Sequence, residues 1–106
     1  MKINASQKIG DLIRKLREGK ELPLRKIASQ LDIDTSFLSK IERNERRATR
    51  EQISKLAEIF EVEKNYLMIP YLSEIVFHEI AGEDCAAQVL KVAEEKVEYI
   101  KAKNSQ

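Results

Sequence analysis

Two short amphipathic segments, joined by only three residues, constrain the fold of this chain most strongly. Within each segment the apolar residues recur three and four positions apart, which is the spacing of one face of an α-helix. The first segment has Leu24, Ile27, Ala28 and Leu31, and the second has Phe37, Leu38 and Ile41. The pattern predicts a helix over 24–31 and another over 35–43, with a tight turn at residues 32–34 between them.

The same spacing predicts helices on both sides of this pair. Apolar positions predict a first helix over 6–19, and Pro23 suits the first turn of the second helix. Thr49 is expected to cap a fourth helix that carries Ile53 to Phe60. Beyond it we expect a short helix over 62–68, a boundary at Pro70, a helix over 72–80 ended by Gly82, and a last helix over 84–102.

The composition agrees with a wholly helical chain. The 106 residues include only three Gly and two Pro, while 42% are hydrophobic and 35% are charged. Such values are typical of an ordered helical protein, and the length suits one domain with a short extension. We therefore predict an all-α fold with one domain over residues 1–70 and a helical extension over residues 71–106.

Charge is distributed unevenly between these two parts. Residues 1–70 carry 15 Lys/Arg and 11 Asp/Glu, a balance of +4, whereas residues 71–106 carry 4 Lys and 7 Asp/Glu, a balance of −3. An asymmetry of this kind suggests that the first part faces a polyanion such as nucleic acid, and that the second part does not.

Several function classes are not indicated. Cys85 is the only cysteine and His78 the only histidine, so we expect neither a disulfide nor a metal site of the usual His/Cys type. No pattern for a catalytic group, a cofactor or a small-molecule effector is visible. Neither a secretory signal nor a membrane-spanning run is present, so we expect a cytoplasmic protein that is not an enzyme and has no cofactor.

The run from Leu24 to Arg43, LRKIASQLDIDTSFLSKIER, resembles the helix-turn-helix of the phage-repressor and Cro-like (XRE-type) regulators. The small residue that this motif needs where its helices cross is supplied by Ala28. The resemblance covers residues 6–69 and implies a five-helix, lambda-repressor-like DNA-binding domain. Its buried positions would be Ile27, Leu31, Ile33, Leu38 and Ile41.

Two positions depart from the pattern of the family, and one pair of charges matches it. The family usually has Gly where this chain has Asp32, because the backbone there is left-handed, a conformation that Asp tolerates. Leu24 replaces a Gln that binds a DNA phosphate. By position, Glu42 would pair with Arg17 and fix the first helix against the third; the alternative is two solvated charges.

The resemblance implies that the third helix enters the major groove of double-stranded DNA with Thr35, Ser36, Ser39 and Lys40 facing the bases. Lys40 is the strongest candidate for base recognition because it can donate to guanine O6 and N7. Thr35 could instead cap the helix, or serve both purposes. Phe37 either packs against the domain or projects toward the DNA.

Contacts to the DNA backbone are expected mainly from the basic loop, which we define as residues 43–50. An isolated run of charges is usually only a solvated face, but a position next to a recognition helix favours phosphate binding. The predicted backbone-binding residues are Lys8, Arg25, Arg43, Asn44, Arg46, Arg47 and Arg50.

The last predicted helix has apolar residues at spacings of 4, 3, 4 and 3, which is a heptad pattern. This dimerisation seam consists of Ala86, Leu90, Ala93, Val97 and Ile100. The seam would pair two copies, fold back on residues 72–80, or do both. Together these features predict a transcriptional regulator, a repressor acting as a homodimer on a palindromic operator. The alternative is a protein-binding adaptor or antitoxin-like partner that uses the C-terminal helices.

Overall fold

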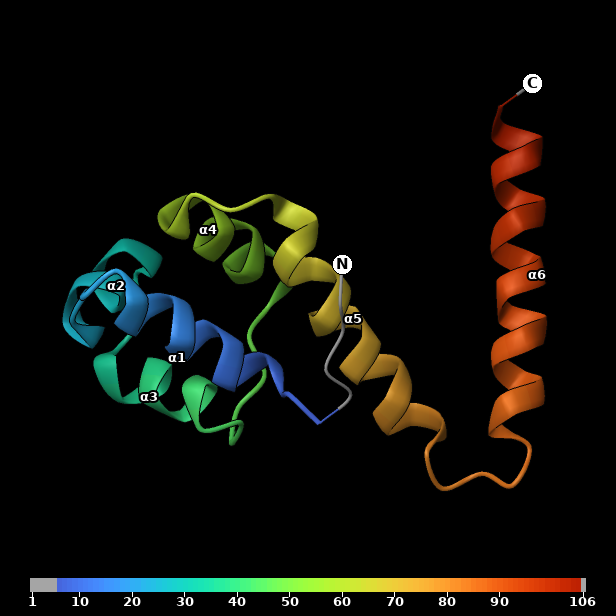
Figure 1. Cartoon of the computed structure of the whole chain (residues 1–106), viewed down its shortest axis with the longest axis horizontal. Coiled ribbons are helices and arrows are strands. Elements are labelled where there is room, and N and C mark those ends of the chain that lie inside the picture. Colours follow the sequence, from blue (N-terminus) through green and yellow to red (C-terminus); the bar gives the residue numbers. More distant parts are fainter. Residues whose placement is uncertain (1–5, 106) are drawn as a thin grey trace. The chain divides into compact units, whose positions relative to one another are not determined.

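The structure, a computed structural model, describes residues 6–105 and contains α-helices but no strand within that range (Figure 1). The helices are α1 (Ile9–Gly19), α2 (Leu24–Leu31), α3 (Thr35–Glu42), α4 (Arg50–Phe60), α5 (Lys64–Ile80) and α6 (Ala86–Asn104). The predicted all-α fold, with a helix-turn-helix domain and a C-terminal helical extension, is confirmed. The chain divides into two compact units, Met1–Glu74 and Ile75–Gln106.

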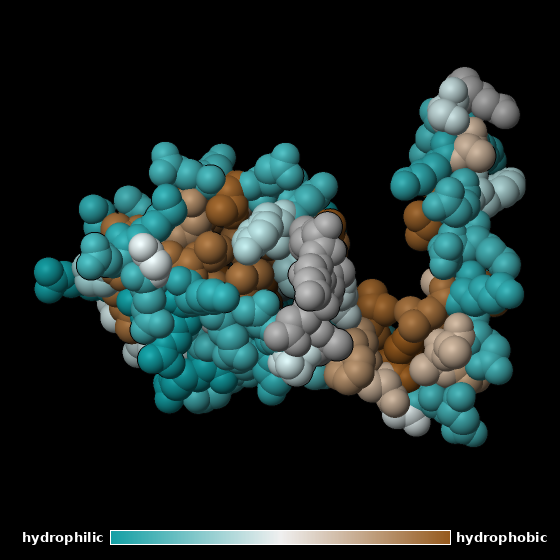
Figure 2. All heavy atoms as spheres, viewed as in Figure 1, coloured by the Kyte–Doolittle hydropathy of each residue, from teal (hydrophilic) through white to brown (hydrophobic). Residues whose placement is uncertain are grey.

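The first unit is built around one apolar core to which five helices contribute. Side chains that are at most 1% exposed come from each of them: Ile13, Ile27, Leu38, Leu56 and Leu67. Four of the five apolar positions expected to be buried in the helix-turn-helix are buried, whereas Ile33 is only half-buried. Hydrophilic residues cover much of the visible face of this unit (Figure 2). Removal of the core side chains from water is the main source of its stability.

The turn between α2 and α3 has the backbone that the sequence predicts. Asp32 lies in the left-handed region, at φ 57° and ψ 46°, where it ends α2. The amide of Ile33 then donates to the carbonyl of Ala28 at 3.0 Å, so carbonyl groups at the end of α2 remain bonded. This sharp ending lets α3 begin only three residues later and cross α2 closely.

Thr49 caps α4 as expected. Its hydroxyl accepts from the amide of Gln52 at 3.1 Å, and the Gln52 side chain accepts from the amide of Thr49 at 2.9 Å. This reciprocal pair is a capping box, which bonds two amides that a helix start would otherwise leave free. The basic loop therefore ends at a rigid helix start.

The predicted helix boundary at Pro70 is wrong, because α5 runs unbroken through it. Proline lacks an amide hydrogen and clashes with the preceding turn, at a cost of about 3 kcal/mol in a helix interior. Around Pro70, Leu67, Met68 and Tyr71 are all buried in the core of the first unit. Tertiary packing on both sides of the proline thus outweighs the lost helix hydrogen bond.

The second unit consists of the end of α5 and the whole of α6. None of the described residues of α6 is buried, and its large apolar side chains are exposed, as Figure 2 shows along this helix. Within residues 6–105 we find no helix whose length and apolar character would allow it to cross a membrane.

Candidate nucleic-acid interface

The helix α3 has one buried face and one outward face. Leu38 and Ile41 are at most 2% exposed and pack into the core. The four residues predicted to face DNA bases lie on the outer side: Thr35, Ser36 and Lys40 are exposed, and Ser39 is half-buried. They occupy positions i, i+1, i+4 and i+5, which form one face of a helix. The fold thus brings the four side chains together on a surface open to solvent.

Thr35 does not cap α3, so the capping interpretation of this residue is wrong. The cap position is held by Asp34, whose side chain makes no capping hydrogen bond, and Thr35 is the first residue of the helix itself. No hydrogen bond of the Thr35 hydroxyl is present within residues 6–105. The hydroxyl is therefore available to an outside partner. Phe37, whose orientation the sequence leaves open, is half-buried.

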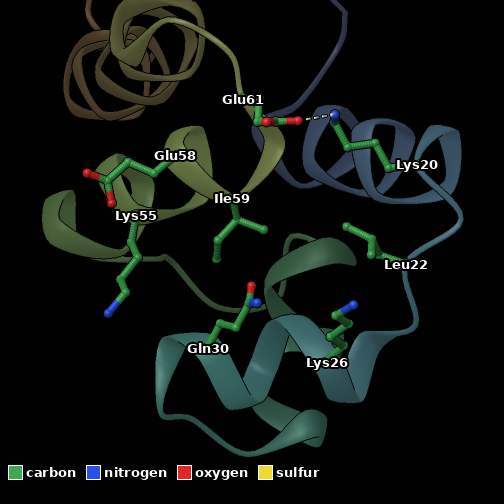
Figure 3. A pocket seen from close by; sticks show the side chains of 8 residues that line it. All are labelled: Lys20, Leu22, Lys26, Gln30, Lys55, Glu58, Ile59 and Glu61. Atoms are coloured by element: carbon green, nitrogen blue, oxygen red, sulfur yellow. Dashed lines mark hydrogen bonds and ion pairs between the residues drawn. The ribbon is translucent and has the colours of Figure 1, made fainter.

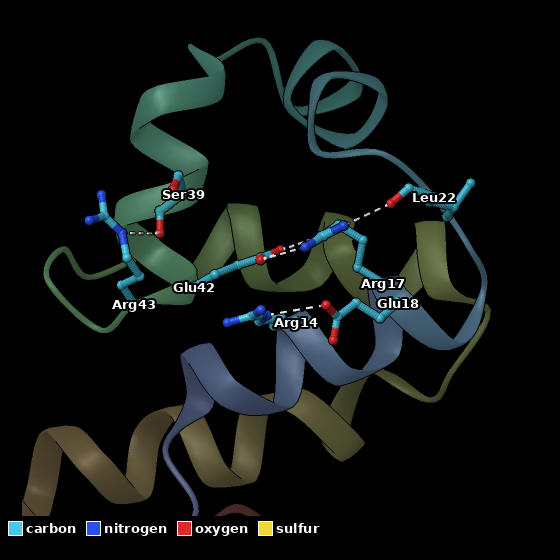
Figure 4. Close-up of polar contacts among 7 residues, drawn as sticks. All are labelled: Arg14, Arg17, Glu18, Leu22, Ser39, Glu42 and Arg43. Atoms are coloured by element: carbon cyan, nitrogen blue, oxygen red, sulfur yellow. Dashed lines mark hydrogen bonds and ion pairs between the residues drawn. The ribbon is translucent and has the colours of Figure 1, made fainter.

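Arg17 and Glu42 form a bidentate ion pair that joins α1 to α3 (Figure 4). The Arg17 Nε donates to Glu42 Oε2 at 2.7 Å, and Nη2 donates to Oε1 at 3.0 Å. A third donor, Nη1, bonds the carbonyl of Leu22 at 3.0 Å. Glu42 is 5% exposed, so this acidic residue of α3 is turned away from the surface that would meet DNA. The hydrogen bond to Glu42 raises the pKa of Arg17 above its ordinary value, although burial of the guanidinium by itself would lower that pKa.

The start of α1 lies directly against the end of α3, a contact that the sequence did not indicate. A Cβ atom on Gly10 would lie 2.4 Å from the Ile41 carbonyl oxygen and 2.8 Å from that of Glu42. Both neighbours are backbone atoms, which cannot move without shifting α3. Gly10 is thus required by the close approach of two helices, and only a lone Gly in an amphipathic segment could have signalled it.

Asn44, a predicted backbone-binding residue, has its side-chain amide bonded within the protein. Its Oδ1 accepts from the amide of Gly10 at 2.9 Å, and its Nδ2 donates to Asp11 Oδ1 at 3.1 Å. The backbone of Asn44 is left-handed, with φ at 63°. Asn44 therefore ties the beginning of the basic loop to α1, and its contact with DNA stays a prediction.

The arginines of the basic loop differ in how they are engaged. Arg43 donates to the carbonyl of Ser39 at 3.3 Å and pairs with Glu45 at 3.1 Å. Arg46, Arg47 and Arg50 are exposed and make no ion pair with any residue in the part of the chain that the structure describes. These three guanidinium groups can therefore bind phosphates without first breaking an internal contact.

Three further predicted DNA-contacting cations also lack an ion pair. Lys8, Arg25 and Lys40 are exposed and form no ion pair within the described range 6–105. Some cations elsewhere on the first unit are paired, as Arg14 is with Glu18 at 3.3 Å and Lys20 with Glu61 at 3.2 Å. Within residues 6–105 four other lysines also form no ion pair, so this property alone does not single out the predicted DNA contacts: Lys15, Lys26, Lys55 and Lys64.

A shallow pocket lies between α2 and α4, away from the predicted DNA contacts (Figure 3). Its lining combines both signs of charge with the apolar Leu22 and Ile59, and contains none of the residues predicted to touch DNA. The Lys20–Glu61 ion pair lies at its edge. No cluster of three or more metal-binding side chains is found among residues 6–105.

Comparisons with known proteins agree with this geometry. A family model described as a helix-turn-helix domain matches residues 10–71. A solved structure of a SinR protein/SinI protein complex is similar in fold, with a TM-score of 0.51 and 23% sequence identity over 92% of this chain and 99% of that chain. Among curated proteins none matches. The family match covers more than half of the chain, and the chain therefore belongs to the XRE-type helix-turn-helix family of DNA-binding transcriptional regulators.

Proposed function

We propose that the protein is a repressor that binds a palindromic operator in the cytoplasm as a homodimer, with α3 of each copy in the major groove. The observation that carries this proposal is the outward face of α3, where Lys40 stands free of any ion pair within residues 6–105, beside three hydroxyl side chains. Lys40 donates to guanine, while the hydroxyls of Thr35, Ser36 and Ser39 add weaker base contacts.

The affinity comes mainly from phosphate contacts. Arg46, Arg47 and Arg50 of the basic loop, with Lys8 and Arg25, supply positive charge without competing ion pairs in the described part of the chain. Each phosphate neutralised releases counterions, so binding to any duplex weakens as salt rises. Arg43 and Asn44 contribute less, because each already has a partner within the protein.

A single recognition helix with one strong hydrogen-bond donor discriminates only weakly between DNA sequences. In this class of protein two such helices bind half-sites one DNA turn, about 34 Å, apart. The dimerisation seam on α6 supports pairing through this helix, because Leu90 is 47% exposed and Val97 and Ile100 are each 53% exposed. Apolar side chains spaced as a heptad gain stability when a second helix covers them.

The test is selection of bound sequences from random duplexes, followed by titration at several salt concentrations. We expect an enriched palindrome, with Lys40→Ala relaxing the preference at one base pair by about 1 to 3 kcal/mol. Arg46→Ala should weaken all duplexes alike and flatten the dependence on salt. Identical effects of the two substitutions would contradict this division of roles.

The second candidate function is that of a protein-binding adaptor or an antitoxin-like partner. It is favoured by the exposed apolar side chains of α6 and by the similar solved structure, which is a complex of two proteins, SinR and SinI. Salt-sensitive DNA binding without any enriched sequence would count against base recognition, whereas failure to bind any duplex would favour this candidate over the operator-binding repressor.

A further inference from the structure

The middle of the basic loop has little internal support. Its beginning is tied to α3 by the amides of Asn44 and Glu45, at 3.0 and 2.9 Å, and its end is tied by the capping box at Thr49. Between them lie residues 46–48, which include two of the arginines with no ion pair. Within the described chain these three residues take part in one hydrogen bond, which is accepted by the carbonyl of Ala48.

The donor of that bond is the Tyr71 hydroxyl of α5, at 2.6 Å from the Ala48 oxygen. Tyr71 and Ala48 are each 5% exposed, so water does not compete for the contact. A buried carbonyl that loses its donor is left without a partner, which makes such a bond costly to break. Tyr71 is itself held in place because Leu67 and Met68, on the same helix, are buried in the core.

We propose that Tyr71 is a positioning residue for DNA-backbone binding, which holds Ala48 so that Arg46 and Arg47 keep the arrangement that phosphates require. The inference rests on the proposed function, in which the arginines of this loop bind phosphates of the DNA backbone. A loop that is already ordered loses less conformational entropy when DNA binds, and affinity is higher for that reason.

A second contact places α5 beside another backbone-binding segment. Glu74, three residues after Tyr71, accepts from the amide of Ile9 at the start of α1. Lys8, the residue immediately before Ile9, is a predicted phosphate contact. The helix α5 therefore contacts both the start of α1 and the basic loop, the two segments outside α2 and α3 that carry predicted phosphate-binding residues.

The decisive variant is Tyr71→Phe, which keeps the ring and removes only the hydroxyl. Tyr66→Phe is the matched control, because Tyr66 lies on the same helix and is 39% exposed. We expect Tyr71→Phe to lower affinity about 3- to 10-fold, the size of one hydrogen bond's contribution, for operator and random duplex alike. The salt dependence should become shallower and the base preference should not change, while Tyr66→Phe behaves as the parent protein.

A second measurement, backbone ¹⁵N order parameters of residues 46–48 without DNA, separates this inference from the proposed function. We expect lower order parameters there in Tyr71→Phe. If the parent protein fails to bind DNA, the proposed function fails, and this measurement still decides whether Tyr71 orders the loop. The inference is overturned if the order parameters are unchanged, or if the variant only melts earlier while affinity and salt dependence remain those of the parent.

Discussion

At the scale of single residues, the position of the recognition helix depends on two contacts with α1. One is the close approach of Gly10 to the backbone of α3, and the other is the Arg17–Glu42 ion pair. They lie toward opposite ends of α1 and both reach the last turn of α3. Together they fix the helix from which the proposed base-contacting side chains project, although neither pair of residues is on the outward face of that helix.

Gly10→Ala should destabilise the protein because the new Cβ would lie 2.4 Å from a backbone oxygen. We expect a loss of about 1 to 3 kcal/mol in the free energy of unfolding, the usual result of overpacking. Gly19→Ala is the matched control, since nothing lies within 4 Å of a Cβ there, and it should be neutral or stabilising by up to ~1 kcal/mol. Urea unfolding measures both. Equal effects would show that helix propensity, and not the contact with α3, determines the result.

Glu42→Ala should cost about 3 kcal/mol of unfolding free energy, because it leaves Arg17 without its partner in a site where Glu42 is 5% exposed. Glu18→Ala removes an ion pair whose members are 59% and 56% exposed and should cost less than about 1 kcal/mol. Comparable losses in the two variants would mean that burial does not strengthen the Arg17–Glu42 pair.

The same pair has a predictable dependence on pH. The pKa of Arg17 is raised by its hydrogen bond with Glu42, so the folded protein holds this proton more tightly than the unfolded chain. The linked stability is fully present below the ordinary pKa of arginine and is lost only above it. The difference between Glu42→Ala and the parent should therefore stay constant from about pH 7 to about pH 10. A fall across this range would contradict the assignment.

Which of these residue contacts the sequence could predict depends on what each one requires. The left-handed backbone at Asp32 is a local property of a helix end, and the Arg17–Glu42 pair follows from positions within a recognised motif. Gly10 is different, because its role depends on what packs against it. The bonds of Asn44 to α1 likewise join segments more than thirty residues apart, and no local pattern encodes them.

At the scale of helices, spacing of apolar residues predicted α1 to α4 and the ending of α2, because these helices are amphipathic and end at local signals. It failed at α5. Pro70 is a strong local signal for a boundary, whereas the reason to continue the helix is the burial of Tyr71 beyond it. Tertiary contacts of this kind cannot be inferred from neighbouring residues alone.

Pro70→Ala should stabilise the protein, since an alanine amide can donate where proline cannot. Removing proline from the helix interior should recover about 3 kcal/mol of stability. The unfolded chain becomes more flexible without proline, which takes back up to about 1 kcal/mol, so we expect a net gain of about 2 kcal/mol in the free energy of unfolding. Pro23→Ala is the control, because Pro23 precedes α2 at its cap with a φ of −74° and loses no helix bond. It should destabilise by about 0.4 to 1 kcal/mol. The two changes in melting temperature should have opposite signs, and a destabilised Pro70→Ala would show that the ring itself is needed for packing.

At the scale of the whole molecule, net charge differs along the chain: residues 1–70 carry a net +4 and residues 71–106, which include α6, carry a net −3. In our proposal these parts have separate roles, since acidic residues keep the C-terminal segment away from DNA while its apolar seam pairs two copies. In this proposal one copy makes few base contacts, so the specificity of the proposed repressor depends on the pairing. Weakening the seam should therefore affect operator binding more than binding to a single half-site.

Leu90→Lys tests that dependence, because it places a charge in the middle of the seam, at a side chain 47% exposed in the single chain. Gln88→Lys adds the same charge on the opposite side of α6, two residues earlier. We expect Leu90→Lys to be monomeric by sedimentation and to lose most of its preference for the full palindrome, while its binding to a half-site stays that of the parent. Gln88→Lys should remain dimeric. A Leu90→Lys protein that is still dimeric and still prefers the palindrome would place the pairing surface elsewhere than on this seam.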